Sequence, residues 1–595
     1  MLYLCSYILL YNDMNYKLTI TKSRNARCFY IQTSYRKSDG RMSTKTVRRL
    51  GSEKAIRELH GVDDAEAWAR AQLAQMREAD RSGRQGVVLE LFTDKVVGAS
   101  ERVFNGGDVF IEKVCSSLGL KEICAGISAS RDFRFDLWRH LMRMICCRIL
   151  HPGSKLSDYA NGSRFIERDK LRLENFYRSL DVLAENFDDI QSAIYRSTIS
   201  SIGRRTGVIY YDCTNVFFET ESDDDFRKYG HSKENRPNPI VQIGLFMDRD
   251  GLPLALCVHP GNRSEQQTLQ PLEEVLADKF GLSKFVVCTD GGLGSHDNRR
   301  YNVTEDRNFI TVQSVKKLSV HYQQWALSPE GWRLRPRLRD DAHTRCTQTY
   351  NLGEIDLDEY VDDTFYKECL TDEEAFEEHL IVTYSRKYDL YQKKIRQQQI
   401  ERAIKKINRG EINRPKSPND CRRFMKDTYF DDKGNPLEVI TAAVLNHELI
   451  AREARFDGFG ALATGLDDDP CEIIKVNSWR WEIEDCFRIG KSDLQMRPVF
   501  VRNENRIKAH LLICFIALLT LKILHKQLNE ASPVAQIRKT LAQMNLIQIE
   551  GFGYVPAFNN DSLAREIQSN ANIHIDTQII TPAKIRANYR IARKR

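Results

Sequence analysis

Paired cysteines, long apolar runs and a strong excess of one charge are missing from this sequence of 595 residues. The 15 cysteines contain no C-x-x-C spacing, which argues against a zinc ribbon or a disulfide framework and is typical of a reducing cytoplasm. The apolar run Leu511–Leu519 is much shorter than the roughly 20 residues that span a bilayer, so it indicates a buried core helix. A net charge of +7 permits a polyanionic partner without requiring one.

The N-terminal residues do not resemble a secretion signal. Met1–Tyr11 is apolar, but it has neither a positive region at its start nor a small-residue cleavage site, so we expect no signal peptide. Met14 is an alternative start.

The chain divides into six segments by its changes in pattern. Residues 1–100 indicate a small β unit plus a helix, rich in basic residues and a candidate for DNA binding. Residues 101–205 are predicted to be helical and are also a candidate DNA-binding region. Their helix Phe133–Leu150 fits two interpretations equally well, a helix lying on DNA and a bundle helix with a solvated basic face. The other segments are 206–300 and 456–530, an interrupted α/β unit, then 301–455, which interrupts it, and 531–595, a helical tail.

Residues 206–300 have the pattern of strands with one helix. Thr206–Glu219 is β-rich, and two strands around an Asp-Arg-Asp-Gly turn form a predicted hairpin over residues 240–259. Glu265–Phe280 has helical periodicity, and Lys284–Thr289 is a short buried strand. The order β-β-β-α-β predicts a mixed sheet covered by helices.

Two aspartates stand where such a sheet would present functional groups. Asp212 lies inside an apolar strand, where a carboxylate is costly to desolvate unless a cation or strong donors compensate. Asp290 directly follows the last strand and precedes Gly291-Gly292, where the backbone can approach a ligand closely. Each aspartate alone also fits a structural role, as a partner of a buried arginine or as a turn cap.

A third carboxylate lies in Asn477–Arg497, which is predicted to form one amphipathic helix. Glu484, Arg488, Lys491 and Gln495 share a face by their i, i+4, i+7, i+11 spacing. An adjacent apolar stripe would face the core, and it consists of Ile483, Phe487, Gly490 and Leu494. Taken alone, the charges would most simply support and solubilise the helix. Together with Asp212 and Asp290, Glu484 completes a set of hard oxygen ligands that suits two Mg²⁺ ions, with Mn²⁺ as a substitute.

Several motifs resemble those of insertion-sequence DDE transposases, in the group whose third carboxylate lies in a Y-R-E-K signature. Anchored on Glu484, Arg480 and Lys491 are in register, whereas Asn477 occupies the tyrosine position. Other matching stretches are YYDCTNVFFE, YGHSKENRPNPIVQIGLFMDRDGLPLALCVHPGN, VVCTDGGL and RIKAHLLICFIALL. The resemblance covers roughly residues 130–525. Glu482 and Asp485 are rivals for the third ligand, but only Glu484 gives both spacings.

The resemblance implies a ribonuclease H-like mixed sheet flanked by helices and interrupted by an insertion domain, which binds two divalent metal ions through Asp212, Asp290 and Glu484. It also implies an enzyme that binds the terminal inverted repeats of its own element, nicks double-stranded DNA and joins the freed 3′-OH to target DNA. We expect a homodimer in the DNA complex, no membrane partner, and a cytoplasmic, nucleoid-associated location in a bacterium or archaeon.

Further residues are candidates for contacts with DNA. The resemblance assigns DNA contact to Arg480 and Lys491. Asn477 stands in the tyrosine position, so it cannot make a contact that needs an aromatic ring, and it could instead cap a helix. Arg488 is a supporting cation. Lys233 and Arg236, with Tyr229 and His231, precede the second strand and are candidate phosphate contacts. Trp325 and Trp332 could stack on an unpaired base, but buried packing is the better interpretation of both.

The leading hypothesis is therefore a transposase that uses metal-dependent phosphoryl transfer. A nuclease with the same core but no strand transfer and a decayed copy that only binds DNA are the alternatives.

Overall fold

The computed structural model describes residues 16–23, 26–36, 42–81, 102–167, 171–335, 348–371, 377–417, 419–428 and 442–594. Two compact units can be separated, Met1–Ala99 and Ser100–Arg595. The expectation for Met1–Tyr11 and the alternative start at Met14 lie outside the described residues and stay predictions.

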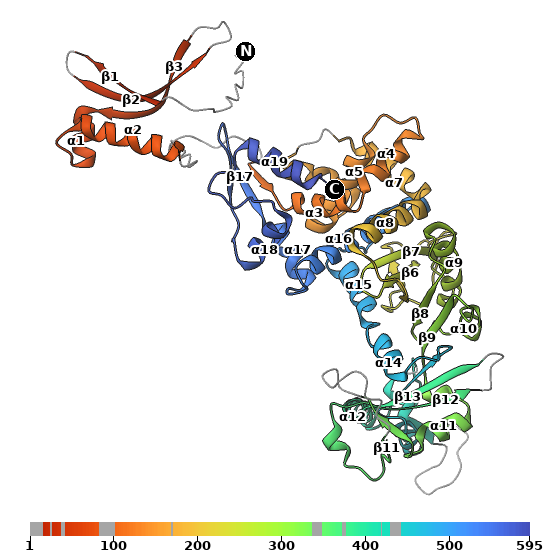
Figure 1. Ribbon diagram of the computed structural model, residues 1–595. Helices are drawn as coiled ribbons and strands as arrows, with labels where there is room; N and C mark the ends of the chain where they lie inside the picture. Colours follow the sequence, from red (N-terminus) through yellow and green to blue (C-terminus); the bar gives the residue numbers. More distant parts are fainter. Residues whose placement is uncertain are drawn as a thin grey trace. The chain divides into compact units, whose positions relative to one another are not determined.

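The first unit is a three-stranded antiparallel sheet with two helices on one face (Figure 1). The strands are β1 (Tyr16–Lys22), β2 (Arg27–Arg36) and β3 (Met42–Ser52), and the helices are α1 (Glu53–His60) and α2 (Ala65–Arg81). Ser52 caps α1 by accepting from the Ala55 N–H, and Gly61 ends it at a φ of 62°. Phe29 is buried against Ile56 and Ala69, so the sheet and the helices share one small core.

The second unit begins with helices that pack around one long central helix. These are α3 (Asp108–Ser117), α4 (Leu120–Ala129), α5 (Leu137–Leu150), α6 (Lys155–Ala160), α7 (Leu173–Glu185), α8 (Phe187–Ile202) and the central α16 (Glu504–Gln527). Helix α16 packs against α5 and α7. By length and composition α16 could cross a membrane, but 94% of its most apolar window is buried inside the protein. The run Leu511–Leu519 therefore lies in a core helix, as predicted.

A ten-stranded mixed sheet forms the centre of the second unit, in the order β11-β10-β12-β13-β16-β9-β8-β5-β6-β7. Strands β5, β6 and β7 form antiparallel pairs, whereas β8 runs parallel to β5 and β9 runs parallel to β8. Their bounds are β5 (Val208–Phe217), β6 (Ile240–Asp248), β7 (Pro253–Pro260), β8 (Phe285–Thr289), β9 (Arg307–Gln313) and β16 (Phe459–Thr464). The predicted mixed α/β architecture is confirmed.

Helices cover both faces of this sheet. Tyr210 and Val216 of β5 belong to the core that contains α16, and Ile209 and Tyr211 belong to a separate core with α9 (Leu269–Val275). Successive side chains of a strand point to opposite faces, so the even-numbered residues of β5 face the side of α16. Helix α15 (Trp481–Ser492) packs on β5, and α10 (His296–Tyr301) follows β8.

The region between residues 301 and 455 adds strands to the same sheet, and two of its strands, β14 and β15, form a separate two-stranded sheet. Strand β16 pairs with β9 on one side and with β13 on the other, so the inserted strands extend the central sheet. The elements are α11 (Val320–Leu327), β10 (Trp332–Leu334), β11 (Thr349–Tyr350), β12 (Phe365–Thr371), β13 (Glu378–Tyr384), α12 (Arg386–Ile407), β14 (Met425–Thr428), β15 (Ala442–Leu445) and α13 (His447–Ala454). Trp332 is fully buried in a core of this region, and Trp325 packs against the same core.

The predicted single helix Asn477–Arg497 is wrong in its extent. Two helices occupy this part of the chain, α14 (Pro470–Ser478) and α15, with a break at Trp479 and Arg480. Asn477 lies inside α14, so it does not cap a helix. Gln495 follows the end of α15 at a φ of 44°, so it does not share the helix face with Glu484. The predicted apolar stripe is correct, since Ile483, Phe487, Gly490 and Leu494 are all buried.

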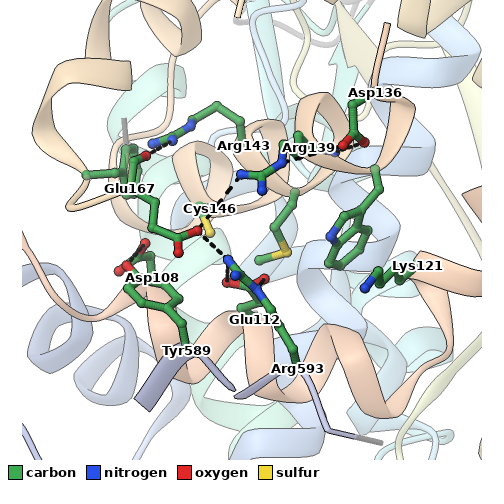
Figure 2. Close-up of a pocket in the computed structure, with 13 residues that line it drawn as sticks. Asp108, Glu112, Lys121, Asp136, Arg139, Arg143, Cys146, Glu167, Tyr589 and Arg593 are labelled. Carbon is green, nitrogen blue, oxygen red and sulfur yellow. Dashed lines mark hydrogen bonds and ion pairs between the residues drawn. The ribbon is translucent and has the colours of Figure 1, made fainter. Parts of the chain in front are cut away.

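The C-terminal segment returns to the helical region. It contains α17 (Val534–Gln543), β17 (Asn545–Ile549), β18 (Gly553–Pro556), α18 (Ser562–Ala571) and α19 (Pro582–Ala592), and β17 pairs with β18 and with β4 (Val103–Asn105). Helix α19 packs against α3, where the Tyr589 hydroxyl donates to Asp108 Oδ2 at 2.8 Å. Arg593 pairs with Glu112 at 2.7 Å and also with Glu167 (Figure 2). These residues line a cavity of about 260 Å³.

Candidate active site

Asp212 lies near the middle of β5 with its side chain on the face covered by α15 and α16. The strand is buried along almost its whole length, and Asp212 is only 9% exposed. Burial raises the pKa of Asp212 to about 6. The negative charge of Asp290 adds to this rise, while Lys233 and Arg480 oppose it. A carboxylate in these surroundings calls for a cation.

Asp290 is brought beside Asp212 by the pairing of two parallel strands. The last paired residues of β5 and β8 are Tyr211 and Thr289, and Asp212 and Asp290 directly follow them in the chain. Asp290 Oδ1 accepts the backbone N–H groups of Gly292 at 3.0 Å and Leu293 at 3.1 Å. The turn thus holds the carboxylate directly after β8. These hydrogen bonds are those of the turn cap that the sequence left open, and the role of Asp290 as a ligand stays a prediction.

Glu484 lies on α15 beside Arg480, with Nη1–Oε1 at 3.6 Å. Its side chain is 61% exposed. Among the described residues, no group of three or more histidine, cysteine, aspartate or glutamate side chains is arranged to hold a metal ion. The two aspartates lie on neighbouring strands, and Glu484 is linked to them through Arg480, which interacts electrostatically with both Asp212 and Glu484.

The two helices that carry the third carboxylate are tied to the strands of the aspartates. The Tyr210 hydroxyl donates to the Val476 carbonyl at 2.9 Å, which joins β5 to α14. The Cys288 thiol donates to Asn477 Oδ1 at 3.8 Å, which joins β8 to the same helix. Asn477 therefore contacts the strand that ends at Asp290, and this contact holds α14 against the sheet.

Lys233 and Lys491 are cations next to Asp212. Lys233 Nζ donates to the Cys213 carbonyl and pairs with Glu265 at 3.0 Å. Burial alone would lower the pKa of Lys233, but Asp212 and Glu265 together raise it. The pKa of Lys491 is lowered by burial and by the charge of Lys233. Both lysines therefore interact electrostatically with Asp212, and each also has a carboxylate partner of its own, Glu265 for Lys233 and Glu234 for Lys491.

Glu234 joins this cation group to the end of α15, and sequence reasoning missed it. It pairs with Lys491 at 3.8 Å and with Arg497. Arg236 lies close by, with an ion pair to Glu234 at 3.7 Å and its guanidinium 4.1 Å from the Phe217 ring centre. Glu234 stands inside a stretch that matches the transposase motifs, which is the signal that could have identified it. Glu265 has no such signal.

The other candidates on α15 form ion pairs of their own. Arg488 is 57% exposed and donates to Asp485 at 2.6 Å, so Arg488 and the rival ligand Asp485 are held by each other. The second rival, Glu482, pairs with the buried Lys522 at 2.7 Å. Glu484 is thus the carboxylate of α15 that pairs with Arg480, the cation that lowers the pKa of Asp212.

A cleft of about 540 Å³ lies close to this cation group, although neither aspartate lines it. Its lining includes Lys233 and Glu265, together with Gly292 from the turn that follows Asp290. Arg263 also lines it and contacts His259 Nδ1 at 3.0 Å. The cleft therefore joins Lys233 to the turn that carries Asp290.

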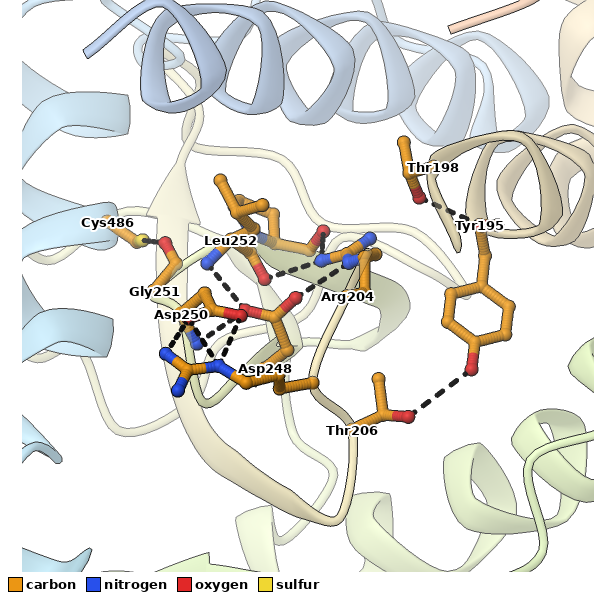
Figure 3. A network of polar contacts seen from close by, with 11 residues as sticks. Tyr195, Thr198, Arg204, Thr206, Asp248, Asp250, Gly251, Leu252 and Cys486 are labelled. Atoms are coloured by element: carbon orange, nitrogen blue, oxygen red, sulfur yellow. Dashed lines mark hydrogen bonds and ion pairs between the residues drawn. The ribbon is translucent and has the colours of Figure 1, made fainter. Parts of the chain in front are cut away.

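A buried ion pair supports the turn on which α15 rests. Arg204 and Asp248 are paired at 2.6 Å, with side chains that are 1% and 0% exposed (Figure 3). Asp248 Oδ1 also accepts the N–H groups of Asp250 and Leu252 at 2.9 Å. The Cys486 thiol of α15 donates to the Gly251 carbonyl at 3.9 Å. The β6–β7 turn and the helix of Glu484 are thus in direct contact.

A comparison with protein families assigns this arrangement to a class. The family described as Transposase DDE domain matches residues 205–520, which contain Asp212, Asp290 and Glu484 and are more than half of the chain. The chain therefore belongs to the DDE transposase family.

Comparisons with individual proteins add little. No curated protein matches the chain. Six chains of solved structures match, among them the piggyBac transposase in a synaptic complex with hairpin DNA, determined by cryo-EM. That match has 10% sequence identity and covers 82% of this chain and 84% of the other. Its TM-score of 0.33 is too low to bear on the fold or the site.

Proposed function

We propose that the chain binds the terminal inverted repeats of its own insertion sequence and catalyses metal-dependent DNA cleavage and strand transfer. The observation that carries this proposal is the register of β5 and β8, which sets Asp212 beside Asp290 inside a DDE domain. The strand order β7-β6-β5-β8-β9, with three antiparallel strands followed by two parallel ones, supports a ribonuclease H-like core.

The two aspartates fit a divalent cation. Asp212 is a buried carboxylate with a second carboxylate beside it, and a bound cation would relieve the cost of both. Asp212 and Asp290 would hold Mg²⁺ or Mn²⁺ as oxygen ligands, with Glu484 as the third ligand once it leaves Arg480. Two such ions, when bound, supply Lewis-acid stabilisation and lower the pKa of the attacking hydroxyl.

Side chains of this protein would hold the DNA during two successive displacements. In the first, a water oxygen bonds to phosphorus at the end of the element, the P–O3′ bond breaks, and a 3′-OH is released. In the second, this 3′-OH bonds to a phosphorus of target DNA and another P–O3′ bond breaks, so the number of phosphodiester bonds is conserved. Lys233, Lys491 and Arg480 would orient the phosphates, because ammonium and guanidinium groups make strong hydrogen bonds to phosphate oxygens. Pairing of two element ends would require a homodimer.

Cleavage of a labelled element end in Mg²⁺ tests this proposal. Asp212→Asn and Asp290→Asn should each lower the cleavage rate by about 100-fold or more, since metal stabilisation is worth several kcal/mol. Glu484→Gln should do the same, whereas Asp485→Asn, on the same helix, is the matched control and should stay within a few-fold of the parent. Parent-like cleavage by Asp212→Asn would refute the assignment. Hydrolysed ends without joined products would favour a nuclease instead.

A further inference from the structure

One face of the sheet in the first unit is left open by the helices. Helices α1 and α2 cover the face that carries Phe29 and Ile31, both fully buried (Figure 1). Because side chains alternate along a strand, the residues between these two face the other way. The open face therefore belongs to Tyr30 and Gln32 of β2 and to their partners on β1 and β3.

The register of the strands places polar and basic side chains in rows across this open face. One row contains Thr19, Tyr30 and Arg49, and the next contains Lys17, Gln32 and Thr46. Gln32 links the rows, since its side chain accepts from Thr19 at 3.0 Å and donates to Thr46 at 3.2 Å.

Positive charge is segregated onto the strands of this unit. The three strands contain no aspartate or glutamate, whereas the acidic residues of the two helices include Glu53, Glu58 and Glu66. Arg27 turns toward the helices and pairs with Glu66 at 2.5 Å. Lys17, Lys22, Lys45 and Arg49 are exposed, and within the described part of the chain none of them has an ion pair with an acidic side chain. Lys17 and Arg49 lie on the open face, whereas Lys22 is paired in register with Arg27 and Lys45 with Thr33, on the face of the helices. The charge of Lys17 and Arg49 is therefore available to a polyanion on the open face.

The dimensions of this face suit the major groove of duplex DNA. Neighbouring strands lie about 4.8 Å apart, so three strands span about 10 Å, and the major groove is about 12 Å wide. Proteins with β-ribbons or β-sheets are known to read DNA in this way. Arginine and glutamine side chains can make paired hydrogen bonds to guanine and adenine edges, respectively.

We propose that the open face of β1, β2 and β3 docks into the major groove of duplex DNA, with Gln32 and Arg49 at the base edges and Lys17 at the phosphates. This inference rests on the proposed function in one respect, since it takes the ends of the element as the preferred DNA sequence. It assigns sequence reading to a sheet of the first unit rather than to the basic helix α5, where Arg143 is buried and stacks on Phe165 at 4.0 Å.

A pair of double variants of the full-length chain tests this docking face. Lys17→Ala with Arg49→Ala removes two cations from the open face, and Lys54→Ala with Arg70→Ala removes two exposed cations from the helices. Binding to a labelled element-end duplex is measured by fluorescence anisotropy at several salt concentrations. The first variant should bind at least tenfold more weakly, and the slope of log K against log salt should fall by about 1 to 2. The second should bind within about twofold of the parent.

Gln32→Ala and Thr46→Glu give independent readouts on the same face. Gln32→Ala should reduce the preference for the element end over a scrambled duplex about tenfold, because a paired contact to a base contributes about 1–3 kcal/mol. Thr46→Glu puts a negative charge at an exposed position without removing packing, so it should weaken binding to both duplexes. Circular dichroism confirms that each variant is folded.

The outcomes separate this inference from the proposed function. If the parent cleaves element ends and the open-face variants bind like the helix-face control, the docking face is wrong and the transposase proposal stands. If the open-face variants lose binding but the parent never cleaves, the docking face stands and the catalytic proposal fails. Equal or tighter binding of an RNA duplex than of the DNA duplex would overturn the choice of DNA as the partner.

Discussion

Arg204→Met should strongly destabilise the β6–β7 hairpin, because it breaks a buried ion pair. The substitution removes the cation from a pair in which neither side chain is more than 1% exposed, and it removes hydrogen bonds to the Leu252 and Pro253 carbonyls at 2.8 and 2.7 Å. Asp248 then keeps two backbone N–H donors but has no counter-charge. Breaking a buried pair by removing one partner costs about 3–5 kcal/mol, which is on the order of a thousandfold in an opening equilibrium.

Hydrogen exchange of peptides from residues 240–260 measures this effect locally, which suits a chain too large for two-state unfolding. Amides of the hairpin should exchange on the order of a thousandfold faster in Arg204→Met than in the parent. Arg205→Met is the matched control, because Arg205 pairs with Asp250 in a side-chain position that is 64% exposed, and such pairs contribute under about 1 kcal/mol. Parent-like exchange in Arg204→Met, or equal effects of the two variants, would refute the reasoning.

Three other substitutions test the packing and the charges of this fold. Burial raises the pKa of Asp108 to about 7, so the folded state keeps a proton that the unfolded chain loses near pH 4. Stability from this group is therefore lost as pH rises from about 4 to 7. We expect the Tm of the parent to decline over this range and Asp108→Asn to flatten that decline; an equally steep decline in both proteins would contradict the assignment. Trp332→Ala should destabilise the inserted region by about 3–5 kcal/mol, measured by protease resistance of that region, because its ring is fully buried; resistance equal to the parent would contradict this packing. Glu482→Gln leaves the buried Lys522 without its carboxylate, so it should lower Tm by several degrees, whereas the exposed pair of Lys508 with Glu504 should tolerate Glu504→Gln.

Local patterns were sufficient for the strands that carry the two aspartates. The β-rich stretch around Asp212 and the short strand before Asp290 are each encoded by neighbouring residues, and the order of elements implied a mixed sheet. The break at Trp479 and Arg480 could not be predicted, because the segment has no proline and no glycine before Gly490 that would signal it. Its position depends on how α14 packs against β5 and β8.

Contacts between distant segments could not be predicted either, because they also depend on tertiary packing. Lys233 and Glu265 pair across a separation in sequence that no helical or strand periodicity covers, and Arg480 lies near Asp212 only because α15 packs on β5. The spacing on α15 suggested Arg488 as a supporting cation, yet Asp485 is a closer partner for it than any group at the aspartates. Periodicity identifies the face of a helix, but tertiary packing decides what that face meets.

Strand transfer from a pre-cleaved end tests the central claim most directly, because the substrate already carries its 3′-OH and only joining remains. The measurement is the yield of joined DNA when a labelled pre-cleaved element end and a target duplex are incubated in Mg²⁺ with the parent, Asp290→Asn or Asp485→Asn. The account predicts joined product from the parent and from Asp485→Asn, and a loss of about 100-fold or more in Asp290→Asn. Joining by Asp290→Asn at the rate of the parent would contradict the assignment of Asp212 and Asp290 as the centre of the active site.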